Sequence, residues 1–261
     1  MNDADERLLR SRLLLGDEAM ERISRARVIV FGVGGVGSWC AEALVRTGVR
    51  HLTIVDGDSV SLSNINRQLM ATVSTVGRPK VEVLRERLLD IAPEADIEAR
   101  VGLFCRETAA EFFGSEEPAG DGLVPCSYDC VVDAIDSLQD KMLLIETACK
   151  SDTFFVSSMG AALKTDPSRI QTAAFAKVHG CALARALRHR FKRAGRRPAR
   201  SFTCVFSDEE GANRWEPLPA ESVADGQSPA AHCRVNGSLV HVTAVFGLTL
   251  AGLVIRHLAG G

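Results

Sequence analysis

A glycine-rich turn between a buried strand and a helix constrains the fold of this chain more than any other feature. The apolar residues 28–31 lead directly into Gly32-Val33-Gly34-Gly35-Val36-Gly37, and a helical pattern begins at Ser38. A second apolar run ends at Asp56, nineteen residues after Gly37. Glycines let a backbone approach a phosphate, and a carboxylate at the tip of the second strand can accept ribose hydroxyls. The pattern predicts a nucleotide site, but it does not distinguish NAD from ATP.

The rest of the chain predicts an α/β fold, a Rossmann-like, mostly parallel sheet with helices on both faces. Strand and helix patterns alternate up to about residue 161, with strands expected at 28–31, 51–55, 97–103, 129–134 and 153–157 and helices at 38–47, 79–91 and 138–149. Beyond that point, strands at 170–175 and 202–206 flank a long basic helix and extend the sheet. We expect one domain over residues 1–261, with a nucleotide-binding core at about 7–176 and a C-terminal part at about 177–261.

Composition and cysteine spacing exclude several classes of protein. A content of 46% hydrophobic and 25% charged residues is not that of a disordered or collagen-like chain. The eight cysteines include no C-x-x-C pair, so reduced thiols and no structural zinc are expected.

Residues 1–10 are charged, and the apolar stretch 238–258 is interrupted by polar residues, which favours a buried or interface helix over a membrane span. We therefore expect a soluble, cytoplasmic protein with no membrane partner.

Two cations follow the second predicted strand. Arg67 lies in Ser61-Leu62-Ser63-Asn64-Ile65-Asn66-Arg67-Gln68, and Lys80 follows Gly77-Arg78-Pro79. A triphosphate requires such cations, because bond cleavage builds negative charge on the leaving phosphate, whereas a dinucleotide dehydrogenase does not. The P-loop signature is absent. ATP is thus the favoured nucleotide, and the alternative for Arg67 and Lys80 is a solvated surface pair.

The glycine turn, residues 56–68, Lys80 and Asp133-Ala134-Ile135-Asp136-Ser137 together resemble the ThiF/MoeB/HesA adenylating superfamily, which is related to ubiquitin-activating enzymes. The resemblance implies that Asp56 holds the ribose, that Asn64, Arg67 and Lys80 hold the phosphates, and that Asp136 holds Mg²⁺. It also implies a homodimer in which Arg10 reaches the ATP of the partner subunit. Simpler alternatives are a helix N-cap for Asp136 and an exposed helix charge for Arg10. The implied nucleotide-binding set is Gly32, Gly34, Gly35, Gly37, Asp56, Asp58, Asn64, Arg67, Gln68, Lys80 and Arg10.

Within that superfamily, three segments resemble the tRNA threonylcarbamoyladenosine dehydratase branch. They are the run from Gly34 to Leu44, Asn64-Ile65-Asn66-Arg67-Gln68, and Cys204-Val205-Phe206-Ser207. The resemblance implies adenylation of the threonyl carboxylate on a tRNA adenosine near the anticodon, followed by ring closure through the neighbouring carbamoyl group. Because that nucleophile is intramolecular, a catalytic thiol is not strictly required. The implied catalytic residues are Arg67, Lys80, Asp136 and Cys204, and Cys204 is equally a candidate for a buried strand cysteine.

A basic segment at residues 185–200 predicts contact with tRNA phosphates. It holds eight cations and no acid, so that the remainder of a chain whose net charge is −2 carries −10. Like charges repel, which makes such a run unusual on a face made only for solubility, although a solvated face is the alternative. The predicted tRNA-binding residues are Arg185, Arg188, Lys192, Arg193, Arg196 and Arg197.

Two other functions remain open at this point. One is an adenylyltransferase that activates a small sulfur-carrier protein or a sulfur-transfer partner, although the paired C-x-x-C zinc motif usual in those branches is absent. The other is a non-catalytic nucleotide-binding scaffold that docks sulfur-transfer proteins. An NAD-dependent dehydrogenase is a more distant alternative.

Overall fold

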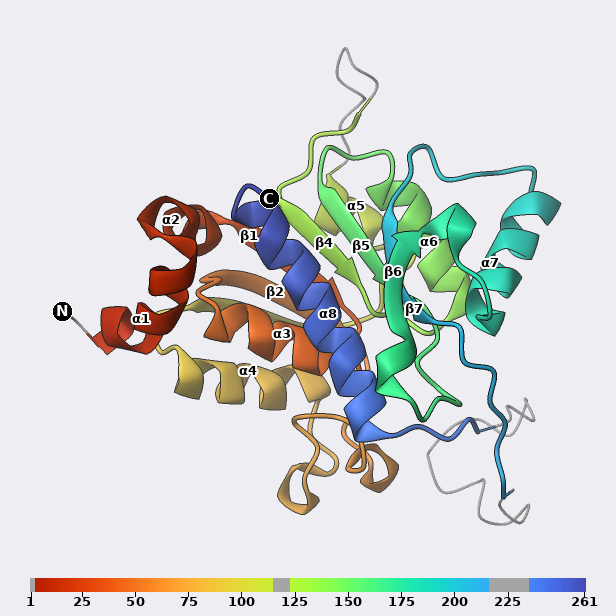
Figure 1. Cartoon of the computed structure of the whole chain (residues 1–261), viewed down its shortest axis with the longest axis horizontal. Coiled ribbons are helices and arrows are strands. Elements are labelled where there is room, and N and C mark those ends of the chain that lie inside the picture. Colours follow the sequence, from red (N-terminus) through yellow and green to blue (C-terminus); the bar gives the residue numbers. More distant parts are fainter. Residues whose placement is uncertain (1–2, 115–122, 216–234) are drawn as a thin grey trace.

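The computed structural model describes residues 3–114, 123–215 and 235–261 (Figure 1). Within these ranges the strands form a seven-stranded sheet in the order β3-β2-β1-β4-β5-β7-β6. All neighbouring pairs are parallel except β6 and β7. The strands are β1 (Arg27–Phe31), β2 (His51–Asp56), β3 (Asp96–Val101), β4 (Cys130–Asp133), β5 (Phe154–Ser158), β6 (Ile170–Ala174) and β7 (Thr203–Ser207). The predicted α/β sheet and its C-terminal extension are confirmed.

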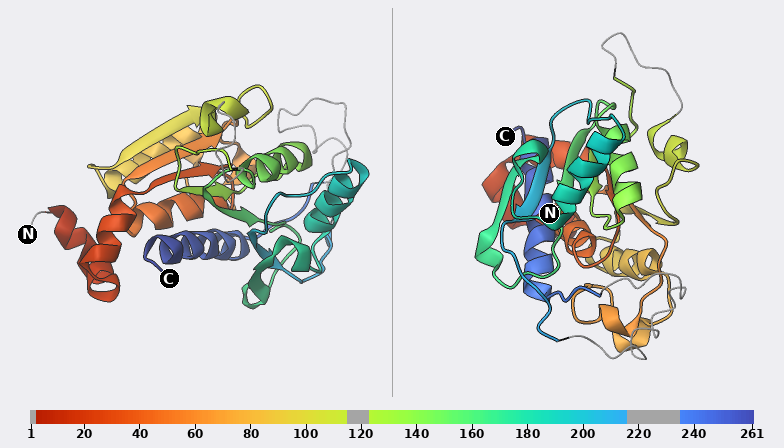
Figure 2. Two further views of the ribbon diagram at one scale, coloured as in Figure 1. Left: turned by 90° about the horizontal axis from the view of Figure 1, so that it is seen from above. Right: turned by 90° about the vertical axis from the view of Figure 1, so that its right-hand side faces the viewer.

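Helices cover both faces of the sheet, which is why its central strands are apolar throughout rather than alternating. One core layer packs α3, α4 and α8 against the sheet, and the other packs α5, α6 and α7 against the opposite face (Figure 2). The helices are α1 (Asp3–Leu15), α2 (Asp17–Arg25), α3 (Gly37–Arg46), α4 (Lys80–Ile91), α5 (Ala109–Phe113), α6 (Leu138–Ala148), α7 (Ala182–Arg193) and α8 (Val240–Leu258).

The apolar stretch, for which a buried or interface helix is expected, forms helix α8 with one face buried in the core. By length and composition alone it is the one helix of the described residues that could cross a membrane. In the fold, however, Val242, Phe246, Leu250 and Val254 have no exposed surface and pack into the core. At Gly247 a Cβ atom would lie 2.4 Å from the carbonyl oxygen of Val36, so α8 contacts the first turn of α3 through backbone.

Helices α1 and α2 precede the sheet; the sequence patterns allow a helix at Arg10 but predict neither the bounds of α1 nor the presence of α2. The side chain of Ile23 in α2 is fully buried, whereas Leu13 and Leu14 at the end of α1 are 78% and 84% exposed. Arg22 of α2 donates hydrogen bonds to the carbonyl oxygens of Leu258 and Ala259 and so stabilises the C-terminus of α8. The second and the last helices of the described chain are thereby joined.

The basic helix is shorter than the basic segment. Helix α7 ends at Arg193, and Gly195 follows with a φ of 64°, a left-handed conformation that favours glycine and stops the helix. The cations from Arg196 to Arg200 therefore lie in the loop that leads into β7.

Candidate nucleotide site

The chain reverses its progress across the sheet at β1. This strand lies between β2 and β4, so the connections after β1 and β4 run to opposite sides, and the carboxyl ends of these strands are where ligands bind in sheets of this kind. Phe31 and Asp133 are register partners at this edge, and the Ala134 N–H donates to the Phe31 carbonyl at 2.8 Å. The glycine turn and the turn that carries Asp136 therefore lie side by side.

Two of the glycines are required by packing. Gly32 has a φ of 82°, and a Cβ there would lie 2.8 Å from the carbonyl oxygen of Ala134. A Cβ at Gly37 would lie 1.8 Å from the carbonyl oxygen of Gly32. No side chain fits at either position, so these glycines set the turn that precedes α3.

Gly34 and Gly35 are placed differently. A Cβ at Gly34 would meet only the Nε2 atom of Gln68, at 3.7 Å, and one at Gly35 would lie 3.3 Å from Cγ of Arg67. Gly34 thus has space above it that the described residues do not fill, at the N-terminus of a ten-residue helix. This arrangement fits a phosphate group bound by backbone N–H groups.

Asp56 lies at the end of β2 and braces the glycine turn. Its Oδ2 atom accepts the Val33 N–H at 2.8 Å, and its Oδ1 atom accepts the Asp58 N–H at 2.9 Å. Burial raises the pKa of this carboxyl group above its usual value. Each carboxylate oxygen retains a further lone pair, which leaves Asp56 able to accept a ribose hydroxyl.

Lys80 reaches the same edge from the start of α4. Its Nζ atom lies 2.6 Å from Asp58 Oδ2 and 4.0 Å from Asp56 Oδ1. Pro79 precedes the helix and directs the chain into its first turn. The structure therefore brings Lys80, Asp56 and Asp58 together, as the motif predicts.

The loop after β2 holds the remaining predicted phosphate ligands. Asn64 is buried, and its Oδ1 atom accepts the Ser61 N–H at 3.1 Å in a capping box, so its side chain also holds the loop in shape. Arg67 donates from Nη1 to the Ser63 carbonyl at 2.8 Å and to Asn66 Oδ1 at 2.9 Å.

Gln68 is the one residue of this loop with an unsatisfied buried atom. Its side chain is 6% exposed, and its Oε1 atom has no hydrogen-bond partner among the described residues. A buried amide oxygen without a partner costs about 1–3 kcal/mol. This oxygen has almost no accessible surface, and the other amide atom, Nε2, is the one nearest to Gly34, so a ligand can reach Oε1 only if the Gln68 side chain moves.

Asp136 is exposed in the turn between β4 and α6. It is not the N-cap of α6, which is Ser137, so the alternative role as a cap does not hold. Sequence reasoning missed Asp133 and Lys141, whose side chains form an ion pair beneath this turn with no exposed surface. The sequence feature that could have indicated this pair is Lys141 itself, a lysine within the apolar part of the helix that follows the motif at Asp133.

Arg10 lies away from this edge, whereas Cys204 lies close to it but is buried, since it is the register partner of Ser157, which is itself the register partner of Asp133. Helix α1 lies near the amino ends of the strands, where Arg7 pairs with Glu94 ahead of β3, so Arg10 is remote from the glycine turn of its own chain. Cys204 has no exposed surface in β7, and burial raises the pKa of its thiol. Its geometry is that of a buried strand cysteine.

The basic segment has tertiary partners that its sequence does not reveal. Arg196 lies 3.0 Å from Glu146 and Arg185 lies 3.9 Å from Glu210, so two of its cations have counter-ions from outside the segment. Arg188 donates to the Phe175 carbonyl, and Arg200 donates to the carbonyls of Ala148 and Thr153. Other cations of this segment are exposed and have neither an ion pair nor a side-chain hydrogen bond within the described ranges. They are Arg190, Lys192, Arg193 and Arg197.

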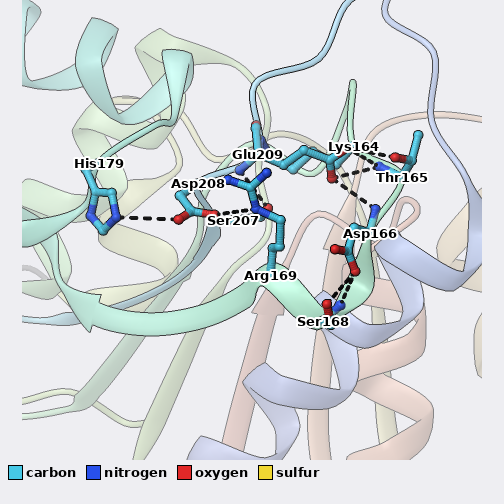
Figure 3. A network of polar contacts seen from close by, with 9 residues as sticks. All are labelled: Lys164, Thr165, Asp166, Ser168, Arg169, His179, Ser207, Asp208 and Glu209. Atoms are coloured by element: carbon cyan, nitrogen blue, oxygen red, sulfur yellow. Dashed lines mark hydrogen bonds and ion pairs between the residues drawn. The ribbon is translucent and has the colours of Figure 1, made fainter.

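A polar network lies beyond the carboxyl end of β7 (Figure 3). The Glu209 carboxylate accepts hydrogen bonds from the N–H and hydroxyl groups of Thr165 and from the Asp166 N–H. These hydrogen bonds lower the pKa of Glu209 to about 2. Lys164 donates to the Glu209 carbonyl, so the segment after β7 is joined to the segment after β5.

The chain is similar to known proteins in both sequence and fold. The sequence model of the ThiF family matches residues 6–261. The chain is 37% identical over 249 residues to the tRNA threonylcarbamoyladenosine dehydratase of Bacillus subtilis, covering 95% of this chain and 93% of that protein. It is 32% identical over 253 residues to the protein of that name from Escherichia coli, covering 94% and 90%. The crystal structure of the E. coli tRNA N6-threonylcarbamoyladenosine dehydratase in complex with ATP aligns with a TM-score of 0.81 at 30% identity, covering 99% of this chain and 96% of that one. The complex with AMP gives the same TM-score.

Proposed function

The chain belongs to the ThiF family, and from this we propose that it catalyses the ATP-dependent cyclising dehydration of threonylcarbamoyladenosine in tRNA. The observation that carries the proposal is the similarity, over nearly the whole length of both proteins, to dehydratases of that name. The uncrowded position of Gly34, with Arg67 next to the adjacent Gly35, supports ATP as the nucleotide, as do the ATP and AMP complexes of the E. coli relative.

The proposed reaction has two steps. The threonyl carboxylate attacks the α-phosphate of ATP, and pyrophosphate leaves to give an acyl-adenylate. The neighbouring carbamoyl group then attacks the acyl carbon and expels AMP, so that the modified nucleoside has lost one water. The second step is intramolecular and requires no protein nucleophile, which agrees with the buried position of Cys204.

We assign the side chains around the glycine turn to positioning and charge stabilisation. Asp56 holds the ribose, and Lys80 and Arg67 offset the charge that develops on the phosphates. Asn64 and Gln68 contact the nucleotide from the loop beside the glycine turn. In this assignment Lys80 exchanges Asp58 for a phosphate oxygen when ATP binds.

Asp136 is the residue that we assign to Mg²⁺. Mg²⁺ in nucleotide sites takes one or two carboxylates together with substrate phosphates, and an exposed carboxylate beside the glycine turn fits that pattern. When bound, the ion neutralises charge on the phosphates. The described residues contain no cluster of three or more acidic, histidine or cysteine side chains suited to a metal held by protein alone.

The partner surfaces follow from the same argument. We propose that the tRNA backbone contacts mainly Lys192, Arg193 and Arg197, which are free of protein partners within the described chain. Arg185, Arg188 and Arg196 have such partners and are expected to contribute less.

We further propose a homodimer in which Arg10 contributes to the partner's site, since α1 exposes Leu13 and Leu14 and lies away from the site of its own chain. We also propose that residues 1–261 form a single adenylating domain, that the protein is cytoplasmic and that it has a sulfur-transfer partner.

Mass spectrometry of tRNA nucleosides tests the proposed reaction. Purified protein is incubated with ATP, Mg²⁺ and tRNA that carries threonylcarbamoyladenosine, and the nucleoside is expected to lose one water only when ATP is present. Parallel reactions replace the tRNA by small carrier proteins that end in Gly-Gly, with pyrophosphate release as the readout. Release stimulated only by a carrier protein, with the tRNA nucleoside unchanged, would overturn the proposal.

A further inference from the structure

Two fully buried charges lie beneath the turn that joins β4 to α6. Asp133 ends β4, Lys141 lies in the first half of α6, and Nζ lies 2.8 Å from Oδ2 with neither side chain exposed. Taking such ions out of water costs several kcal/mol each, and an apolar pair of similar volume is often at least as stable. Stability of the core therefore does not account for this pair.

Both charges bind the same backbone residue, Ile135. Asp133 Oδ1 accepts the Ile135 N–H at 3.0 Å, and Lys141 Nζ donates to the Ile135 carbonyl at 2.8 Å. These groups belong to the peptide units on either side of Ile135, and the second unit includes the backbone nitrogen of Asp136. The pair thus fixes the path of the chain into Asp136.

The turn is held from two further directions. Ser157 of β5, the register partner of Asp133, donates its hydroxyl to Asp133 Oδ2 at 2.6 Å and so fixes the carboxylate. On the opposite side, Gly32 approaches the Ala134 carbonyl so closely that no side chain fits between them. The position of Asp136 relative to the glycine turn is therefore set by contacts beneath and beside it.

We infer that Lys141 is a positioning residue, which together with Asp133 and Ser157 holds Asp136 in place for a divalent cation on the nucleotide. This inference rests on the role proposed above for Asp136. Lys141 has no exposed surface, so it acts through the Ile135 carbonyl rather than on the nucleotide. Removing the pair is expected to loosen the turn and weaken metal binding while the fold persists.

The test uses a double variant, because removal of one charge alone leaves the other buried and unpaired. Asp133→Asn combined with Lys141→Met removes both charges, and Ser157→Ala provides a milder change at the same carboxylate. Lys164→Met is the matched control, since Lys164 is also buried and also donates to a backbone carbonyl, that of Glu209, but in a different turn.

Two readouts are taken on the full chain without tRNA. Hydrogen exchange of the amides at 134–137 is expected to be about tenfold faster in the double variant, less affected in Ser157→Ala and unchanged in Lys164→Met. Binding of Mn²⁺ in the presence of a non-hydrolysable ATP analogue is expected to weaken about tenfold in the double variant, while metal-free binding of the analogue stays within about twofold.

Unchanged exchange in a folded double variant, or an equal change in Lys164→Met, would overturn the inference. So would faster exchange without any loss of Mn²⁺ affinity. Because neither readout uses tRNA, failure of the wild-type protein to dehydrate tRNA counts against the proposed function alone.

Discussion

Lys80 Nζ lies 2.6 Å from Asp58 Oδ2, and only one end of this ion pair is buried. The Lys80 side chain is 7% exposed, whereas that of Asp58 is 69% exposed. The lysine is thus held by the protein around it, while its partner can turn into solvent. We therefore expect a phosphate to displace Asp58 rather than Lys80 to move.

Lys80→Ala is therefore expected to lower ATP–pyrophosphate exchange at least about 100-fold, because the charge that offsets the phosphates is lost. Arg78→Ala is the matched control, since Arg78 is a neighbouring cation that pairs with Glu86 on the outside of α4. The exchange assay with substrate tRNA measures both. Equal losses in the two variants would mean that general surface charge, not this site, is responsible.

The two kinds of glycine in the turn predict opposite defects. Gly34→Ala is expected to fold normally, with a thermal midpoint within a few degrees of wild type, but to bind ATP at least about tenfold more weakly because its methyl group occupies the open space. Gly37→Ala is expected to lose stability, since its Cβ meets the Gly32 carbonyl at 1.8 Å. Calorimetric titration and thermal melts separate the effects. Wild-type ATP affinity in Gly34→Ala would place the phosphates elsewhere.

Cys204→Ala is expected to retain dehydratase turnover within a few-fold of wild type. The thiol is buried and its raised pKa keeps it protonated at neutral pH, so it cannot serve as a nucleophile in this conformation. The expected cost is in stability, roughly 1 kcal/mol for the truncated core side chain. A folded Cys204→Ala protein with turnover reduced more than 100-fold would show instead that the thiol takes part in the reaction.

Replacing Lys192, Arg193 and Arg197 by Ala is expected to weaken tRNA binding and to reduce the slope of log K against log salt by about two to three. ATP affinity should not change. Arg25→Ala serves as control, because Arg25 is an exposed cation on α2 that pairs with Glu21. Filter binding at several salt concentrations measures the slope, and a slope equal to that of wild type would indicate a solvated surface.

Glu209→Gln gives a pH-dependent prediction. The pKa of Glu209 is lowered to about 2, so its carboxylate contributes stability that is fully present above the usual glutamate pKa and is lost as pH falls through 2. The thermal midpoint of Glu209→Gln should lie a few degrees below that of wild type at pH 7, and the gap should close between about pH 4.5 and 2. Glu210→Gln, at the exposed neighbouring position, should show no such convergence.

Local patterns predicted several residues that the structure brings to one edge of the sheet, because each lies at a strand end or a helix start; their role in binding a nucleotide stays a prediction. The glycine turn, Asp56 and the start of α4 at Lys80 each follow from a strand end or a helix start, and parallel strands bring their carboxyl ends to one edge. The fold class follows from the same alternation.

What the sequence could not predict depends on tertiary packing. The Asp133–Lys141 pair requires the register of β4 with β5 and the docking of α6, neither of which is encoded locally. Likewise, residues 185–200 contain no acid, and the partner of Arg196 is Glu146 on α6, fifty positions earlier. The bounds of helix α1 were not predicted because its leucines do not cover one buried face: Leu13 and Leu14 are adjacent and both exposed.

The contact of Gly247 with the first turn of α3 has a consequence for the order in which the protein matures. The glycine turn and α3 are among the first elements to leave the ribosome, yet the helix that packs on them, α8, is the last element of the described chain to be synthesised. The nascent chain must therefore hold an incomplete nucleotide site, with its apolar α3 face uncovered, until α8 has emerged. Nucleotide binding can therefore stabilise the complete site only after α8 has emerged and packed on α3.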